Sequence, residues 1–99
     1  MIYETLAYAV DHNVAVITLN RPKVMNALNS QMRAEITDAV GQAGQAARVV
    51  VLTGSGRAFC SGQDLGAEGN FADIDLERTL KDEYVPMLKA ITECPVPTI

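Results

Sequence analysis

The glycine-rich stretch between residues 54 and 69 is the part of the chain best suited to chemistry, because it holds five of the seven glycines. It follows residues 49–52, an apolar run that predicts a strand covered on both faces. Ligands of α/β sheets usually bind just beyond the carboxyl ends of the strands, and glycine lets the backbone approach them closely. This loop is therefore the first candidate for a binding or catalytic site.

Two phosphate-binding motifs fail to match the loop. The dinucleotide fingerprint would require a third glycine after Gly54 and Gly56 at position 59, where Phe59 stands. No Gly-Lys-Ser/Thr sequence follows, so the loop is not a P-loop either. The glycines must serve another purpose.

The reactive side chains in the loop have ordinary structural interpretations that we favour. Cys60 is expected to be a small buried residue rather than a nucleophile. Asp64 is a conceivable base, but a carboxylate that stabilises the loop by accepting N–H bonds is the favoured interpretation. Glu68, Asp73 and Asp75 precede a helical pattern, and we expect them to favour its N-terminus.

Metal chemistry has no support in the sequence. His12 lies in a turn signal without a companion ligand, so an exposed histidine is expected. Cys60 and Cys94 match neither a zinc spacing nor a CxxC motif. We therefore expect no metal site.

Composition narrows the class of protein. The 99 residues have a net charge of -4, which argues against a nucleic-acid partner and weakly against an anionic membrane. No apolar run is long enough for a membrane span, and the first residues lack a signal-peptide layout. A cytoplasmic protein with two reduced thiols is expected.

The first half of the chain predicts a hairpin and then a helix. Residues 3–9 and 13–19 have strand character, and Asp11-His12-Asn13 between them has turn chemistry. Asn20-Arg21-Pro22-Lys23 ends the second strand. A helix is expected over residues 30–45, capped by Asn29 or Ser30, with an apolar stripe at Met32, Ile36 and Val40.

The second half predicts a strand over residues 48–53, so that strand, helix and strand form a βαβ crossover. A second helix is expected over residues 75–92, where Pro86 should kink or split it. Its apolar stripe, more often core than ligand surface, comprises Leu76, Leu80, Tyr84, Met87, Leu88 and Ile91. The chain stops on residues 94–99, which have the pattern of the beginning of a buried strand, so we expect the polypeptide to continue.

Two motifs in register resemble one known family. Residues 56–65, Gly-Arg-Ala-Phe-Cys-Ser-Gly-Gln-Asp-Leu, resemble the crotonase (enoyl-CoA hydratase/isomerase) signature, in which a strand ends in Gly-x-Gly-x-Ala-Phe-x-x-Gly-x-Asp-Leu/Ile. Residues 17–22, Ile-Thr-Leu-Asn-Arg-Pro, and 26–28, Asn-Ala-Leu, resemble the N-terminal motif of the same family. Order and spacing also match, and the resemblance covers essentially the whole chain.

The resemblance implies a fold and a chemistry. It implies an α/β fold, the crotonase spiral of ββα repeats, of which residues 1–99 form the N-terminal portion of one domain. Chemistry on the thioester of an acyl-CoA places negative charge on its carbonyl oxygen, and backbone N–H groups can stabilise that enolate. In the family one donor belongs to the residue after the loop glycine, here Gln63 after Gly62; the second donor and the acid/base carboxylates would lie beyond Ile99.

The resemblance also implies a groove for coenzyme A, which is part of the substrate. Arg21 and Lys23 are candidates for its phosphates, although a solvated surface cation is an equal alternative for each. The remaining residues implied for the groove are Ala27, Leu28, Ala58, Ser61, Gln63, Asp64 and Leu65.

Within the family, the Ser-Gly-Gln-Asp-Leu form and residues 82–88 look closest to the ring-epoxide isomerases of phenylacetyl-CoA breakdown. The favoured function is hydration or isomerisation of an enoyl-CoA without a metal or redox cofactor, and the resemblance implies assembly as a trimer or a dimer of trimers. A crotonase-fold scaffold that binds acyl-CoA without turnover, and an unrelated α/β domain, are the alternatives.

Overall fold

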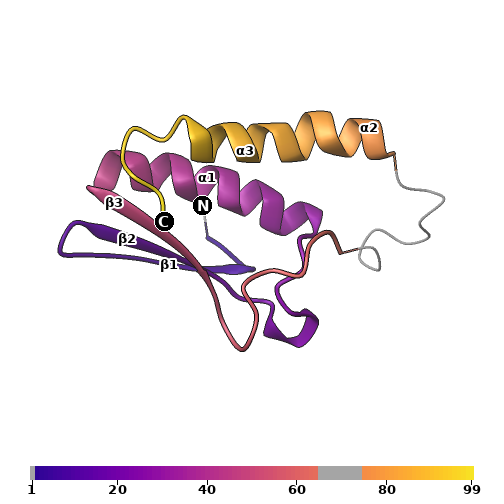
Figure 1. Ribbon diagram of the computed structural model, residues 1–99, viewed down its shortest axis with the longest axis horizontal. Helices are drawn as coiled ribbons and strands as arrows, with labels where there is room; N and C mark the ends of the chain where they lie inside the picture. The colour runs from indigo at the N-terminus through magenta and orange to yellow at the C-terminus, as the bar shows by residue number, and fades with distance from the viewer. Residues whose placement is uncertain (1, 65–74) are drawn as a thin grey trace.

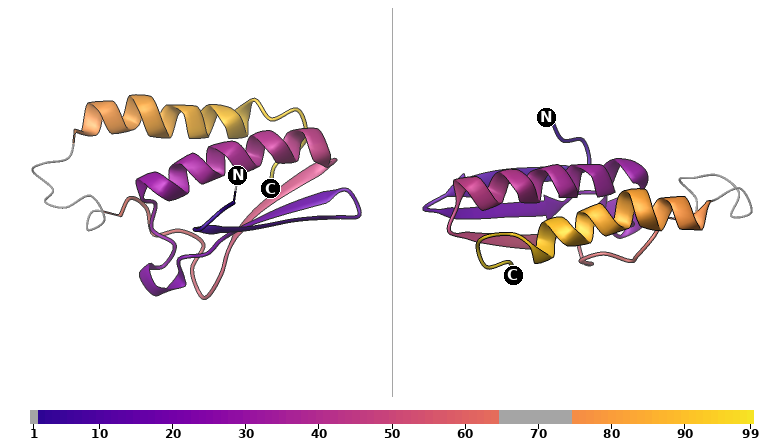
Figure 2. Two further views of the ribbon diagram at one scale, coloured as in Figure 1. Left: turned by 180° about the vertical axis from the view of Figure 1, so that it is seen from behind. Right: turned by 90° about the horizontal axis from the view of Figure 1, so that it is seen from above.

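The structure, a computed structural model, describes residues 2–64 and 75–99. One sheet in the order β1-β2-β3 carries α1 and α3 on the same side (Figures 1 and 2). The elements are β1 (Leu6–Asp11), β2 (Val14–Leu19), the 3-10 helix η1 (Pro22–Val24), α1 (Ser30–Ala46), β3 (Val49–Gly54), α2 (Leu76–Thr79), the π-helix η3 (Leu80–Tyr84) and α3 (Val85–Thr92).

The predicted hairpin is confirmed, with its turn at His12 and Asn13. Both residues have positive φ, 51° and 66°, as a two-residue turn between twisted antiparallel strands requires. The His12 side chain is 91% exposed beside Asp11, in agreement with the expected solvent-exposed histidine.

The first strand begins later than predicted. It starts at Leu6 and not at residue 3, because the backbone N–H groups of Glu4 and Thr5 do not pair with a neighbouring strand. They donate instead to the carboxylate of Glu35 on α1, Thr5 at 2.8 Å, and the Thr5 hydroxyl donates at 2.7 Å. A carboxylate that is almost fully buried thus ties the N-terminal segment to α1.

The first crossover follows the sequence closely. The Asn29 side chain caps α1 by accepting the Met32 N–H at 2.8 Å, as predicted. The stripe of Met32, Ile36 and Val40 is buried against the sheet. After α1, β3 pairs in parallel with β2, so the predicted strand–helix–strand unit is confirmed.

The prediction that the third strand is covered on both faces was wrong for the part of the chain that the structure describes. In β3 only Val50 is fully buried, since both long helices lie on one side of the sheet. The other edge of β3 is paired: residues 97–99 run parallel to it, with the Ile99 N–H donating to Val50 at 2.8 Å. The strand-like residues at the end of the sequence therefore do pair with β3 as a short parallel bridge.

The second helix is continuous through Pro86 but changes its winding. Residues 80–84 form a π-turn, in which the Val85 N–H donates to the Leu80 carbonyl five residues earlier. Pro86 has no N–H to donate, so the wider turn accommodates it without splitting the helix. No helix among the described residues has the length and apolarity needed to cross a membrane.

The extra residue in the π-turn divides the predicted apolar stripe. Met87 is buried, and Tyr84 and Ile91 pack against the core. The interpretation of the stripe as core holds for these residues but not for three others, which are about half exposed: Leu76, Leu80 and Leu88.

Removing the Glu35 carboxylate is expected to destabilise the fold. Burial alone would raise the pKa of Glu35, but hydrogen bonds from Gln31, Glu4 and Thr5 outweigh it and lower the pKa, so the group is a buried anion. Glu35→Ala leaves several buried donors without an acceptor and should lower the free energy of unfolding by about 3 kcal/mol, measured in urea. Glu4→Gln, at an exposed carboxyl, should change it by less than about 0.5 kcal/mol; equal losses would contradict the assignment.

Candidate functional site

A short parallel pairing between Leu28 and Gln63 forms the centre of the candidate site. The Leu28 N–H donates to the Gly62 carbonyl at 2.7 Å, and the Asp64 N–H donates to the Leu28 carbonyl at 2.8 Å. Because the neighbours of Gln63 make both bonds, its own N–H points to the opposite side of the loop. No described residue accepts a hydrogen bond from it.

Gly62 gives the loop the conformation that this pairing needs. Its φ is +107°, in a region that side chains other than hydrogen rarely tolerate. A Cβ built there would meet nothing within 4 Å, so conformation and not crowding demands the glycine. The sequence motif thus has a local structural cause.

Asn26 fastens the segment before Leu28 to the loop after β3. Its side chain is fully buried and accepts the Arg21 N–H at 2.8 Å. Its amide nitrogen donates to the carbonyls of Ser55 at 3.0 Å and Ala58 at 2.8 Å. Gly54 lies against this junction, where an added Cβ would come within 2.5 Å of the Ala58 carbonyl oxygen.

Arg21 and Asp64 form an ion pair across the same junction. The Arg21 guanidinium lies 2.9 Å from the Asp64 carboxylate and also donates to the Ala27 carbonyl. Asp64 therefore acts as the expected loop-stabilising carboxylate. The positive charge of Arg21 is paired with Asp64, so Arg21 is a weaker candidate for binding a coenzyme phosphate. Lys23 is exposed and forms no ion pair among the described residues.

The other residues implied for the groove lie around this junction. Ser61 donates its N–H to the Met25 carbonyl at 3.0 Å. An open hollow of about 450 Å³ next to it is lined by residues 20–24, including Lys23. Leu65 lies outside the described residues. The structure thus brings together, from two distant segments, Arg21, Ala27, Leu28, Ala58, Ser61, Gly62, Gln63 and Asp64.

A small apolar cavity of about 150 Å³ lies beside the loop, between the sheet and both helices. Leu28 belongs both to its wall and to the pairing with Gln63. Cys60 contributes a free thiol to the wall and packs against the core, but it is only partly buried and not the fully buried residue that was expected. The remaining wall residues are Leu19, Ile36, Leu52, Phe59, Met87 and Ile91.

Behind the loop, Arg33 forms a buried polar network. Its guanidinium is fully buried, lies 2.8 Å from the Glu83 carboxylate and donates to the Leu28 carbonyl at 3.0 Å. It also lies over the Tyr84 ring, 4.8 Å from the ring centroid. The network therefore links α1 and η3 to one partner of the central pairing.

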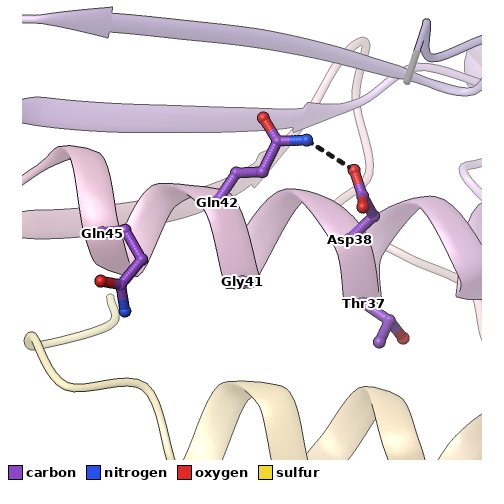
Figure 3. Close-up of a pocket in the computed structure, with 5 residues that line it drawn as sticks. All are labelled: Thr37, Asp38, Gly41, Gln42 and Gln45. Atoms are coloured by element: carbon purple, nitrogen blue, oxygen red, sulfur yellow. Dashed lines mark hydrogen bonds between the residues drawn. The ribbon is translucent and has the colours of Figure 1, made fainter.

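A larger hollow lies elsewhere, on the exposed side of α1. Figure 3 shows its lining, in which Gln42 donates to Asp38 at 2.8 Å. It measures about 690 Å³ but is shallow, and its five lining residues include none of the predicted site residues. Volume alone therefore does not locate the site. No group of three potential metal ligands occurs within residues 2–64 and 75–99.

Sequence reasoning assigned no role to Asn26, Arg33 or Glu83. Asn26 was part of a recognised motif, and its buried position could have been suspected from an asparagine between apolar residues. Arg33 and Glu83 are 50 residues apart, so no local signal connects them. Asp75 was predicted to favour a helix start and does cap α2 by accepting the Arg78 N–H at 3.0 Å, while Glu68 and Asp73 lie outside the described residues.

The fold and the glycine loop define a class of protein. Residues 9–99 match the family described as enoyl-CoA hydratase/isomerase, so the chain belongs to the enoyl-CoA hydratase/isomerase, or crotonase, family. Crotonase-fold neighbours also confirm the predicted fold class.

Particular relatives are similar along the chain. A probable enoyl-CoA hydratase of Rhodobacter capsulatus is 54% identical over 99 residues, which are 100% of this chain and 38% of that protein. The 1,2-epoxyphenylacetyl-CoA isomerase of Escherichia coli is 33% identical over 91% of this chain and 36% of its own length. The crystal structure of an enoyl-CoA hydratase/isomerase from Xanthobacter autotrophicus Py2 superposes with a TM-score of 0.86 at 36% identity, covering 98% of this chain and 38% of that one. The chain thus spans about 38% of the length of such relatives.

Asn26→Asp is expected to break the junction. The carboxylate retains the acceptor for Arg21 but places a negative charge against the Ser55 and Ala58 carbonyls, so unfolding free energy in urea should fall by about 3 kcal/mol. Asn20→Asp makes the same chemical change at an exposed neighbour that accepts from the Ser55 hydroxyl, and should cost less than about 0.5 kcal/mol. An Asn26→Asp protein as stable as the control would refute the role.

The Glu83 carboxylate should make stability depend on pH. Burial alone would raise its pKa, but the hydrogen bonds from Arg33 and Ser30 and the positive charge of Arg33 hold the pKa below the ordinary 4.5. Its stabilising contribution is therefore full above about pH 4.5 and is lost as the pH falls through the lower pKa of the folded state.

Urea unfolding between pH 6 and about pH 3 should show this as a falling stability whose slope is reduced in Glu83→Gln. Glu77→Gln, which removes an exposed carboxyl nearby, should keep the wild-type slope. An unchanged slope in Glu83→Gln would show that the ion pair contributes nothing.

Proposed function

We propose that the complete protein is an enoyl-CoA hydratase or isomerase that stabilises a thioester enolate with the backbone N–H of Gln63. Family membership supports the reaction class, because the relatives named above are described as hydratases or isomerases. These descriptions favour turnover over the scaffold alternative.

The direction of the Gln63 N–H carries the proposal. Its neighbours on both sides are fixed by hydrogen bonds of 2.7 and 2.8 Å to Leu28, so the donor is held in place before any ligand arrives. A donor that needs no reorganisation stabilises developing negative charge most effectively. The thioester carbonyl oxygen is the atom on which an enolate carries that charge.

The surroundings of Gln63 suit the two ends of an acyl-CoA. The hollow lined by residues 20–24 carries the exposed Lys23, which can meet a coenzyme phosphate. The apolar cavity whose wall includes Leu28 suits a hydrocarbon acyl group, because each buried methylene contributes about 0.8 kcal/mol. We propose that Gln63 lies between these two regions.

The proposal extends to properties that the described residues do not address. The acid/base carboxylates and the second oxyanion donor would come from further parts of the complete protein, so the 99-residue chain alone should be inactive. The reaction would need no metal or redox cofactor. The enzyme would be cytoplasmic and assemble as a trimer or a dimer of trimers. Either hydration or isomerisation fits, and the isomerase of Escherichia coli makes a ring-epoxide acyl group one candidate substrate.

Gln63→Pro in the complete enzyme should lower turnover of crotonyl-CoA by roughly 10²–10³, the usual loss for one oxyanion donor. Proline removes the N–H but leaves both bonds of the pairing, since Gly62 and Asp64 make them. Gln63→Ala keeps the N–H and should lower turnover less than about tenfold. Loss of the enoyl-thioester absorbance measures the rate, and circular dichroism confirms folding.

Equal losses in the two folded variants would contradict the backbone role. Tight binding of crotonyl-CoA by the wild-type protein without any loss of absorbance would contradict hydratase activity and leave the isomerase and scaffold alternatives.

A further inference from the structure

The side chain of Gln63 is joined to the buried network behind the loop. The Tyr84 hydroxyl donates to Gln63 Oε1 at 3.4 Å, and Arg33 Nη1 donates to the same hydroxyl at 3.3 Å. Glu83 in turn holds Arg33 at 2.8 Å. A continuous line of contacts therefore runs from an ion pair inside the fold to the residue whose backbone faces the proposed substrate.

The donors and acceptors along this chain of hydrogen bonds follow from the side-chain chemistry. A guanidinium has only donors, so Arg33 must use the lone pair of the Tyr84 hydroxyl. Among the described residues the hydroxyl proton then goes to Gln63, which turns the amide oxygen toward Tyr84 and the amide nitrogen away. The Tyr84 ring is itself held by Arg33 against one face, so the donor cannot swing freely.

Burying the amide nitrogen of Gln63 costs stability, and apolar packing alone does not explain why it is buried. Its nitrogen is inaccessible to solvent and finds no partner among the described residues. A buried donor without an acceptor is unfavourable, and such groups are uncommon outside functional positions. The side chain is thus held inward despite this penalty, and the contact with Tyr84 is the polar interaction that compensates it.

We propose that Tyr84 is a positioning residue for the oxyanion donor, which it aims by clamping the Gln63 side chain. The inference rests on the function proposed above. The pairing to Leu28 leaves the backbone N–H of Gln63 unused, and its side chain contacts Tyr84 among the described residues. At 3.4 Å this contact is longer than an ordinary O–H···O hydrogen bond, and we expect it to shorten when a ligand completes the site.

The test is Tyr84→Phe in the complete protein, which removes the hydroxyl and keeps the ring over Arg33. Turnover of crotonyl-CoA should fall about threefold to tenfold with KM changed less than twofold, as expected when one weak neutral hydrogen bond is lost mainly in the transition state. The infrared carbonyl stretch of bound butyryl-CoA, carbon-13-labelled at the thioester carbon, should move back toward its value in water. This readout reports only on bound ligand, so a smaller folded fraction does not imitate it.

Tyr3→Phe is the matched control. It also removes a tyrosine hydroxyl bond, the one to Asp38 at 2.6 Å, at a position outside the site. The carbonyl frequency and turnover should stay at wild-type values. A Tyr84→Phe spectrum identical to that of Tyr3→Phe would overturn the inference.

A double-mutant cycle with Gln63→Met tests whether the hydroxyl acts through this side chain. Methionine keeps the backbone N–H and the length of the side chain but removes the amide. If the clamp is the cause, the double variant should lose no more turnover than either single variant. Additive losses would mean that Tyr84 acts by another route.

Failure of this inference can be told apart from failure of the proposed function. A wild-type protein that binds butyryl-CoA without any carbonyl shift would contradict the oxyanion role, and the inference with it. A normal wild-type shift that persists in Tyr84→Phe would overturn the positioning role alone.

Discussion

Everything in the candidate site depends on one constraint, the pairing of Leu28 with Gln63 across 35 residues of sequence. It is only one bridge long, but it sets which way each peptide group of the loop faces. The carbonyl of Gly62 and the N–H of Asp64 turn toward Leu28, which leaves the N–H of Gln63 facing outward. A single hydrogen-bond register thereby converts a flexible glycine loop into an aimed donor, the feature that enolate stabilisation requires.

Buried polar side chains hold that register. Asn26 ties three backbone groups together from a fully buried position, and the pair of Arg21 and Asp64 closes the junction from outside. Arg33 supports it from behind, with its charge balanced by Glu83. Apolar packing could not fix this register, because the hydrophobic effect is not directional, whereas each hydrogen bond fixes the orientation of a particular peptide group. The stability of the site is accordingly concentrated in a few polar residues.

Local signals in the sequence predicted much of the fold. The hairpin, the cap of α1 and the β2-α1-β3 unit each follow from residues near one another in the chain. The errors had two causes. The distant residue Glu35 accepts hydrogen bonds from the N-terminal segment, so β1 begins later, and a local π-turn before Pro86 leaves three members of the apolar stripe at the surface. For the site, the motif located Gly62 and Gln63, but the network of Arg33 joins residues 50 positions apart and leaves no pattern. Long-range polar contacts are therefore the part that only a structure reveals.

The central claim is that the Gln63 N–H binds the thioester oxygen. A crystal structure of the complete protein with butyryl-CoA, which cannot be hydrated, tests this directly. The account predicts the thioester oxygen about 2.7–3.2 Å from the Gln63 backbone nitrogen, with the pairing to Leu28 intact. A bound thioester whose oxygen lies more than about 4 Å from that nitrogen, or a Gln63 N–H turned toward the protein, would contradict it.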